Sequence, residues 1–304
     1  SAGYYSVLLK DFNIKSELTA ALRSGLQKHT YNKNGKDFVQ LDLGFSINWD
    51  TPAETFIKII NDHTICGYRY STGWAKEQRV YFYTEFSKPI FKSFLIADSL
   101  YRKNIFEVKG KTTRAIFQFD LKTNSDLLIK TGISSVSIDN AKLNLENDIK
   151  DWNFNQIKND ASQKWNKELS KIQVKSSNKN LLRTFYTAFY HSMLVPVVFS
   201  DVNNEYKGAD GETHSAKDYT KYSIFSLWDT FRAEHPLFTI IQPERVNDMI
   251  NSMLSHYNEY GLLPVWELLG HETGTMIGYH AIPVIADAIL KGFTGFDINL
   301  AYES

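Results

Sequence analysis

The chain has 304 residues, which is enough for two domains or one large domain with an ample hydrophobic core. Its 34 basic and 34 acidic side chains give a net charge of zero, so nothing favours nucleic acid or an acidic membrane surface as a partner. The single cysteine, Cys66, excludes an internal disulfide, and no run of about 18 apolar residues would span a membrane.

Short runs rich in β-branched and aromatic residues fill the first part of the chain. In one of them Ala115, Phe117, Phe119 and Leu121 occupy alternate positions and share one face. Because no helical pattern separates these runs, residues 1–138 are predicted to form an antiparallel β-sandwich, and the chain is expected to start inside it. The predicted strands are Tyr4–Leu9, Glu17–Arg23, Phe38–Leu43, Phe56–Ile60, Val80–Phe86, Ile90–Ile96, Arg114–Leu121 and Leu127–Ile133.

A Gly-Trp pair, Gly73-Trp74, ends a tyrosine-rich run in this region. An indole beside a glycine at a strand edge would offer an aromatic platform to a ligand. Cross-strand packing of the tyrosines and the tryptophan is the favoured interpretation, since such pairs are a common way to stabilise a sheet.

Residues 139–178 are predicted to be a helical connector. The apolar spacing indicates two amphipathic helices, Ala141–Ile149, with Asp139 or Asn140 as its N-cap, and Phe154–Leu169. A short strand is predicted at 172–174, and Ser176-Ser177-Asn178 is expected to cap the next helix.

From residue 179 to 304 the apolar period becomes helical. Prolines and glycines mark the ends of the segments, and short polar loops join them. This pattern is similar to the opening half of an α/α toroid, which further helices would have to close into a barrel. The predicted helices are Leu181–Leu194, Ser226–Ile241, Glu244–Tyr260, Thr273–Lys291 and Asp297–Glu303.

Metal and nucleotide motifs are weak. The stretch 201–212 alternates oxygen ligands as an EF-hand loop does, but Tyr206 stands where that loop needs glycine, so a turn with local side-chain caps is favoured. The sequence has no His-Glu-x-x-His arrangement, Gly-x-Ser-x-Gly elbow, phosphate loop or dinucleotide fingerprint. Of the hydrolytic mechanisms considered, hydrolysis by a pair of carboxylates is the one that these absences leave open.

Polar and aromatic side chains gather in 226–272. A carboxylate, a guanidinium and an indole occur together in Trp228, Asp229 and Arg232, and Trp266-Glu267 repeats the pairing of indole and acid. Indole faces stack on sugar rings, while carboxylates and arginine bond to neighbouring hydroxyls, so one carbohydrate cleft is predicted. The alternative is that Asp229 caps a helix and that Arg232 and Glu267 form an internal ion pair.

The run FSLWDTFRAEHPL and the later run LPVWELLGHETGTMIGYHAIPVIADAILKG are similar to glycoside hydrolase family 92, the calcium-dependent exo-acting α-mannosidases. Runs such as ICGYRYSTGWAKEQRVYFYTEFSKP extend the resemblance over nearly the whole chain. It implies an α+β multidomain protein of which this chain is a fragment, lacking the start of the sandwich and the later part of the barrel. The acid and base of the family would then lie beyond Ser304, so the fragment itself is expected to be inactive.

The resemblance also implies a function and its residues. The parent protein would remove terminal α-linked mannose, first of all α-1,2-linked, from mannosides or N-glycans with inversion and with calcium, whose ligands are not located here. It would be periplasmic, at the cell surface or secreted in a bacterium. Two alternatives stay open, an α/α-barrel glycoside phosphorylase and a non-catalytic carbohydrate-binding protein. The residues assigned to substrate binding are Trp228, Asp229, Arg232, Trp266, Glu267 and, on their place in the matching run alone, His271 and Glu272.

Overall fold

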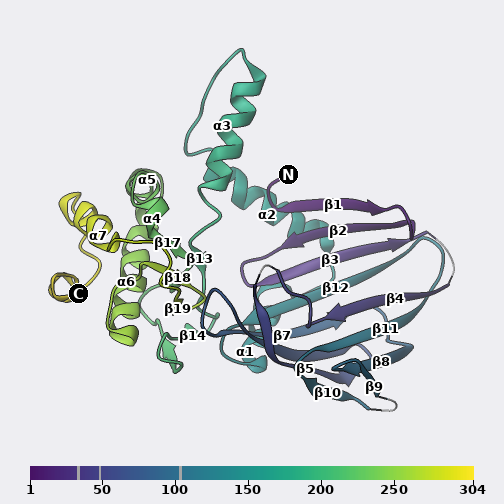
Figure 1. The fold of residues 1–304 in the computed structure, drawn as a ribbon. Coiled ribbons are helices and arrows are strands. Elements are labelled where there is room, and N and C mark those ends of the chain that lie inside the picture. The colour runs from purple at the N-terminus through teal and green to yellow at the C-terminus, as the bar shows by residue number, and fades with distance from the viewer. Residues whose placement is uncertain (33–34, 48, 103–104) are drawn as a thin grey trace. The chain divides into compact units, whose positions relative to one another are not determined.

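The structure is a computed structural model that forms two compact units (Figure 1). It describes residues 1–32, 35–47, 49–102 and 105–304. The units are Ser1–Gly73 with Glu77–Trp165, and Trp74–Lys76 with Asn166–Ser304. Each unit contains its own hydrophobic core. Within the described residues, no helix has the combination of length and apolar character needed to cross a membrane.

Two antiparallel sheets build the first unit, and they confirm the predicted sandwich. The larger sheet has the strand order β1-β2-β3-β12-β7-β6-β5-β10, and the smaller has the order β4-β11-β8-β9. Phe86 and Leu127 of the larger sheet pack with Phe117 and Phe119 of the smaller in one buried core. The strands are β1 Tyr4–Leu9, β2 Ile14–Ala20, β3 Ser24–Tyr31, β4 Gly35–Asp42, β5 Thr51–Asn61, β6 Thr64–Thr72, β7 Gln78–Phe86, β8 Lys92–Ala97, β9 Leu100–Arg102, β10 Glu107–Gly110, β11 Thr113–Leu121 and β12 Ser125–Ser134.

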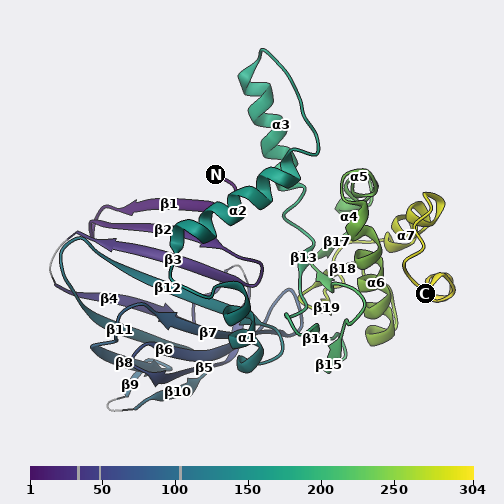
Figure 2. The same cartoon turned by 180° about the vertical axis from the view of Figure 1, so that it is seen from behind.

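Helix α1 (Ile138–Asp148) covers the other face of the larger sheet, where it packs on β12 and β7 (Figure 2). Its Leu145 joins Leu26 of the sheet in a second apolar cluster. The Ser137 side chain caps this helix by accepting a hydrogen bond from the N–H of Asn140, so the predicted cap at Asp139 or Asn140 is wrong. Helix α2 follows and has the predicted bounds, Phe154–Leu169.

Gly132 in β12 permits the close approach of α1. A Cβ atom at this position would lie 2.2 Å from the carbonyl oxygen of Ala141, which is a backbone atom of the helix. We therefore expect Gly132→Ala to lower the free energy of unfolding by about 1–3 kcal/mol, because the helix must move away from the sheet. Urea denaturation of the whole protein measures the change.

A matched control exists on the neighbouring strand. A Cβ at Gly25, which pairs with Thr131, would meet nothing closer than the carbonyl oxygen of Thr19 at 4.0 Å. Gly25→Ala should therefore leave the unfolding free energy nearly unchanged. Equal losses in the two variants would show that the contact between helix and strand does not limit stability.

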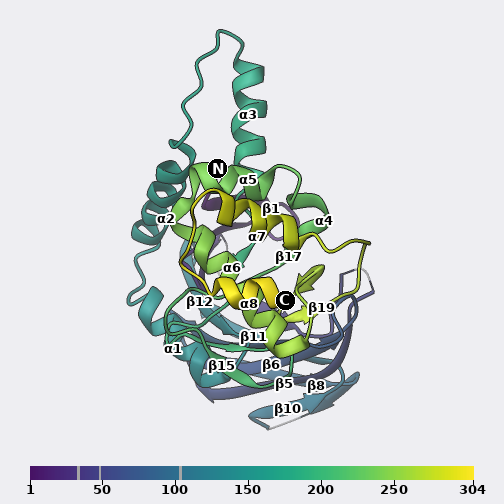
Figure 3. The same cartoon turned by 90° about the vertical axis from the view of Figure 1, so that its left-hand side faces the viewer.

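Helices with short strands between them build the second unit. Leu227, Phe238, Met253 and Ala281 are buried in its core, and α7 packs against α5 and α6 (Figure 3). Its helices are α3 Lys179–His191, α4 Leu227–Thr230, α5 Glu234–Ile241, α6 Pro243–Tyr260, α7 Ala281–Leu290 and α8 Ile298–Glu303. Its strands are β13 Val197–Val198, β14 Glu205–Lys207, β15 Thr213–Ser215, β16 Tyr222–Ser223, β17 Phe225–Ser226, β18 Trp266–Leu268 and β19 His271–Glu272.

Two of the predicted helices differ from the structure. The single helix predicted over Ser226–Ile241 is divided into α4 and α5, because Pro236 has no N–H to continue a helical ladder and its ring would clash with the preceding turn. The helix predicted from Thr273 starts only at Ala281. Residues Gly274, Met276 and Gly278 have positive φ angles of 63°, 69° and 95°, which an α-helix excludes.

Candidate substrate-binding site

A short antiparallel strand pair joins the two tryptophan segments of the second unit. In the pairing of β17 with β18, Ser226 lies opposite Trp266. Leu227, Trp228 and Asp229 follow β17, so the segment that carries them starts at the residue opposite Trp266. The predicted helices end at Tyr260 and start again at Thr273, which leaves Trp266-Glu267 between them, whereas the structure places this pair on strand β18, which pairs with β17.

Trp228 is the centre of an aromatic and cationic cluster. The guanidinium carbon of Arg232 lies 4.9 Å from the centroid of the Trp228 ring, and Arg232 Nε donates to the Trp228 carbonyl at 3.2 Å. The His280 ring meets Trp228 nearly edge-on at 5.3 Å and stacks on Phe231 at 4.1 Å. Arg232 is exposed, so its terminal N–H groups can reach a ligand while the indole supports the charge.

Two carboxyl groups lie near this cluster. Asp229 is exposed, and Ser226 Oγ donates to its Oδ2 at 2.5 Å. Glu234, at the start of α5, is half-buried, and its Oε1 has no hydrogen-bond partner among the residues described. Burial, with a contribution from the charge of Asp229, raises the pKa of Glu234 to about 7. Neither Glu234 nor His280 is among the site residues predicted from the sequence.

The raised pKa of Glu234 predicts a pH dependence of stability. An unfolded chain releases this proton near the ordinary glutamate pKa of 4.5, whereas the folded protein keeps it up to a pH of about 7. The contribution to stability is therefore complete below 4.5 and is lost as the pH rises through about 7. We expect the melting temperature to fall less over this range in Glu234→Gln than in the parent. Calorimetry in a series of buffers measures this, and parallel curves for the two proteins would refute it.

Trp74 belongs to the second unit together with Ala75 and Lys76, although the chain on either side of these three residues belongs to the first. Its ring centroid lies 4.2 Å from that of Trp266, with a 36° angle between the planes, and its Nε1 donates to Thr275 Oγ1. Trp74 keeps 38% of its surface exposed. The favoured interpretation from sequence, packing across strands of the sheet, does not describe this contact, which instead extends the aromatic surface at Trp266.

The carboxylate of Glu272 accepts hydrogen bonds from backbone groups. The N–H of Val265 donates at 2.8 Å, that of Trp266 at 3.1 Å and that of Gly274 at 2.8 Å. Glu272 therefore shapes the loop that carries Trp266. His271 is partly buried on the same short strand, β19, where it lies opposite Leu268.

Glu267 lies inside the second unit. It is 2% exposed, and its two oxygens accept hydrogen bonds from the Ser223 hydroxyl and from the N–H groups of Ile224 and Gly270. Its role as a direct sugar ligand, expected from the sequence, does not fit this burial. The alternative ion pair with Arg232 is absent from the described residues, in which Arg232 is turned to Trp228.

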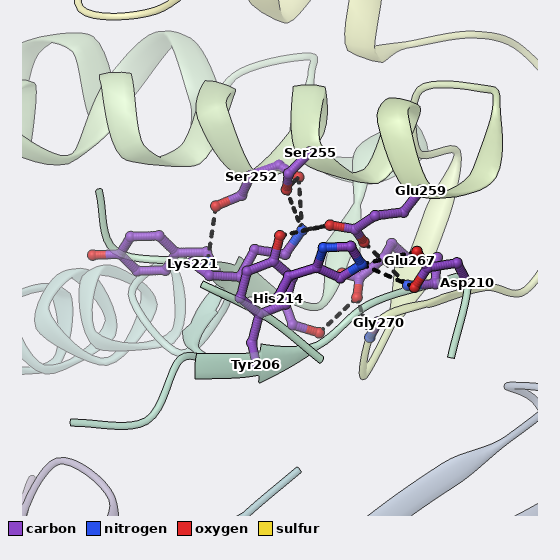
Figure 4. Close-up of polar contacts among 12 residues, drawn as sticks. Tyr206, Asp210, His214, Lys221, Ser252, Ser255, Glu259, Glu267 and Gly270 are labelled. Carbon is purple, nitrogen blue, oxygen red and sulfur yellow. Dashed lines mark hydrogen bonds and ion pairs between the residues drawn. The ribbon is translucent and has the colours of Figure 1, made fainter. Parts of the chain in front are cut away.

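A buried polar cluster surrounds Glu267 (Figure 4). Lys221 is 2% exposed, and its Nζ donates to the Ser252 carbonyl at 3.1 Å and to Ser255 Oγ at 2.5 Å. Glu259 Oε1 lies 3.9 Å from Lys221 Nζ and accepts from the Tyr206 hydroxyl at 2.6 Å. Burial lowers the pKa of Lys221 and raises that of Glu267, and the attraction between the two charges opposes both shifts.

Calcium ligands are not located among the described residues. Within them, no group of three or more His, Cys, Asp or Glu side chains is placed to hold a metal. In the stretch 201–212, Asp210 pairs with His214 at 2.8 Å and accepts from the N–H of Glu212, as a locally capped turn does. Asn203 likewise accepts from the N–H of Glu205.

Two family profiles match this chain. The one described as the glycosyl hydrolase family 92 N-terminal domain covers residues 1–134, and the one described as the family 92 catalytic domain covers residues 140–304. A solved family GH92 α-mannosidase from Bacteroides thetaiotaomicron is 37% identical with a TM-score of 0.95, over 99% of this chain and 41% of that chain. The same enzyme has also been solved in complex with mannoimidazole.

Two further relatives are more distant. A family GH92 inverting mannosidase from Bacteroides thetaiotaomicron VPI-5482 is 28% identical with a TM-score of 0.90, over 99% of this chain and 40% of that one. An uncharacterized secreted glycosidase of Arthroderma benhamiae is 28% identical over 208 residues, which are 66% of this chain and 22% of that protein. The chain therefore spans about two fifths of the solved mannosidases and less of the secreted glycosidase.

Proposed function

Because the chain belongs to glycosyl hydrolase family 92, we propose that the protein containing it hydrolyses terminal α-linked mannose from mannosides or N-glycans with inversion. The observation that carries the proposal is that Ser226, opposite Trp266 in the strand pair, lies three residues before exposed Asp229, while exposed Arg232 lies over the indole of Trp228. The solved relatives are named as mannosidases, and we therefore propose mannose as the sugar.

The chemistry of these groups suits a sugar. A carboxylate accepts and a guanidinium donates hydrogen bonds to neighbouring hydroxyls, and both bonds are strengthened by charge. Indole faces offer an apolar surface to the C–H face of a pyranose ring, and Trp74 enlarges that surface at Trp266. We assign Asp229 and Arg232 to the hydroxyls of the terminal mannose. Trp266 and Trp74 would support its ring or that of the next sugar.

The cleavage step needs further groups. An inverting glycosidase uses a carboxylic acid for the leaving oxygen and a carboxylate for water, about 6.5–9.5 Å apart. With Asp229 assigned to binding, we place both groups in the part of the catalytic domain that this chain does not span, since it covers 41% of the solved mannosidase. The chain alone should then bind mannosides without cleaving them.

Proton NMR of the whole protein with α-1,2-mannobiose tests the proposal. Mannose that appears first as the β-anomer would establish an inverting α-mannosidase with activity on the α-1,2 linkage. Cleavage that needs added phosphate would identify a glycoside phosphorylase instead. Binding without any product from the whole protein would identify a carbohydrate-binding protein and overturn the proposed hydrolysis.

Calcium dependence and location complete the proposal for the whole protein. A chelator added to the same NMR experiment should suppress cleavage, and added calcium should restore it. Within the described residues no group of three or more His, Cys, Asp or Glu side chains is placed to hold the ion, and its ligands stay unassigned. The relative named a secreted glycosidase supports a secreted, periplasmic or surface location, which fractionation of the producing cells would test.

A further inference from the structure

Ile224 has a backbone conformation that its side chain disfavours. Its φ angle is +70°, in the left-handed region that β-branched residues rarely adopt. It is the single residue between β16 and β17, and β17 leads directly to Trp228 and Asp229. A change in the backbone at Ile224 would therefore redirect the segment that carries the sugar-binding side chains.

Glu267 holds this turn from the neighbouring strand. Its Oε2 accepts from the N–H of Ile224 at 2.8 Å, and its Oε1 accepts from the hydroxyl of Ser223 at 2.8 Å. At 2% exposure the carboxylate has almost no access to water that could replace these bonds. A conformation that the side chain disfavours persists only where its surroundings fix it, and Glu267 supplies that restraint.

The same carboxylate fixes a second left-handed turn. Leu269 and Gly270 join β18 to β19 with φ angles of +51° and +89°, and the N–H of Gly270 donates to Glu267 Oε1 at 2.5 Å. A Cβ at Gly270 would lie 2.8 Å from the carbonyl oxygen of Lys207, so this turn is also confined by the chain behind it. Trp266 immediately precedes Glu267, and its strand position depends on this turn.

We propose that Glu267 is a positioning residue whose buried carboxylate clamps the turns at Ile224 and Gly270 and so fixes Trp266 against the segment that carries Trp228 and Asp229. The side chain does not touch the sugar in this role. The inference rests on the proposed function for its substrate, but its structural part can be measured without catalysis.

The first test is Glu267→Gln in the whole protein. Glutamine keeps one acceptor oxygen, but its amide group would face the N–H of either Ile224 or Gly270, so one of the turns loses its bond. We expect kcat/KM for α-1,2-mannobiose to fall about 10- to 30-fold in protein that remains folded. Amide hydrogen exchange in the peptides 222–230 and 264–274 should become faster.

Glu259→Gln is the matched control. Glu259 is a buried carboxylate of the same cluster, but it accepts from the Tyr206 hydroxyl and the Ala209 N–H, which lie outside both turns. We expect it to lower the melting temperature and to leave kcat/KM within about threefold of the parent. Equal losses of kcat/KM in the two variants would refute the positioning role, because general loosening of the cluster would then explain both.

A second variant separates positioning from stability. Glycine adopts a positive φ without strain, so Ile224→Gly in the Glu267→Gln background should recover at least about tenfold in kcat/KM although it removes a side chain from the packing. No recovery would overturn the proposal. If the parent protein proves inactive on mannosides, the proposed function fails, and the hydrogen-exchange comparison still tests the clamp. Unchanged exchange in both peptides of Glu267→Gln would then reject it.

Discussion

Asp229→Ala in the whole protein is expected to lower kcat/KM for α-1,2-mannobiose at least about 100-fold, since it removes a charge-assisted bond to the reacting sugar. The carboxylate is exposed and is oriented by the Ser226 hydroxyl at 2.5 Å. Replacement should therefore cost little stability. Steady-state kinetics measured together with the melting temperature separate these two effects.

Two companion variants sharpen this expectation. Asp218→Ala removes another exposed carboxylate of the same unit and should leave kcat/KM unchanged. Asp229→Asn keeps the shape and loses the charge, so its deficit measures the electrostatic part of the interaction. An Asp229→Ala enzyme as active as the parent would remove Asp229 from the sugar site.

Local patterns in the sequence predicted much of the fold. Alternation in Ala115–Leu121 identified β11, and all four residues assigned to one face are buried in the sandwich core. The apolar spacing in Phe154–Leu169 gave the observed bounds of α2. Strand β3, Ser24–Tyr31, was missed because its residues are largely polar, and it is held between β2 and β12 by pairing that no local pattern reveals.

The loop around Trp266 shows why the site was predicted less well than the fold. A helix was expected near it, but the chain forms the short strands β18 and β19. Successive side chains of a strand point to opposite faces, so on β18 the side chains of Trp266 and Glu267 cannot both face a ligand. Glu267 faces the interior and Trp266 remains part of the surface.

Contacts between residues far apart in the chain could not be predicted from the sequence. The contact of Trp74 with Trp266 depends on how the second unit folds. No local pattern in either segment predicts that the two side chains meet. The half-buried state of Glu234 depends in the same way on the division between α4 and α5. Composition and spacing therefore identified the segments around Trp228 and Trp266, while the places of Trp74, Glu234 and Glu267 required coordinates.

Trp266→Ala should raise KM for α-1,2-mannobiose about 30- to 100-fold with a smaller change in kcat. The substitution removes the indole opposite Ser226 and its contact with Trp74, whose ring centroid lies 4.2 Å from that of Trp266. Trp266→Phe keeps an aromatic face at this position and should recover most of the affinity. Leu262→Ala removes an exposed apolar side chain a few residues earlier and serves as the control. If KM is unchanged in Trp266→Ala while kcat falls, Trp266 acts on the reacting geometry and the assigned stacking role is wrong, because a ring that only supports the sugar contributes to binding in the ground state and the transition state alike.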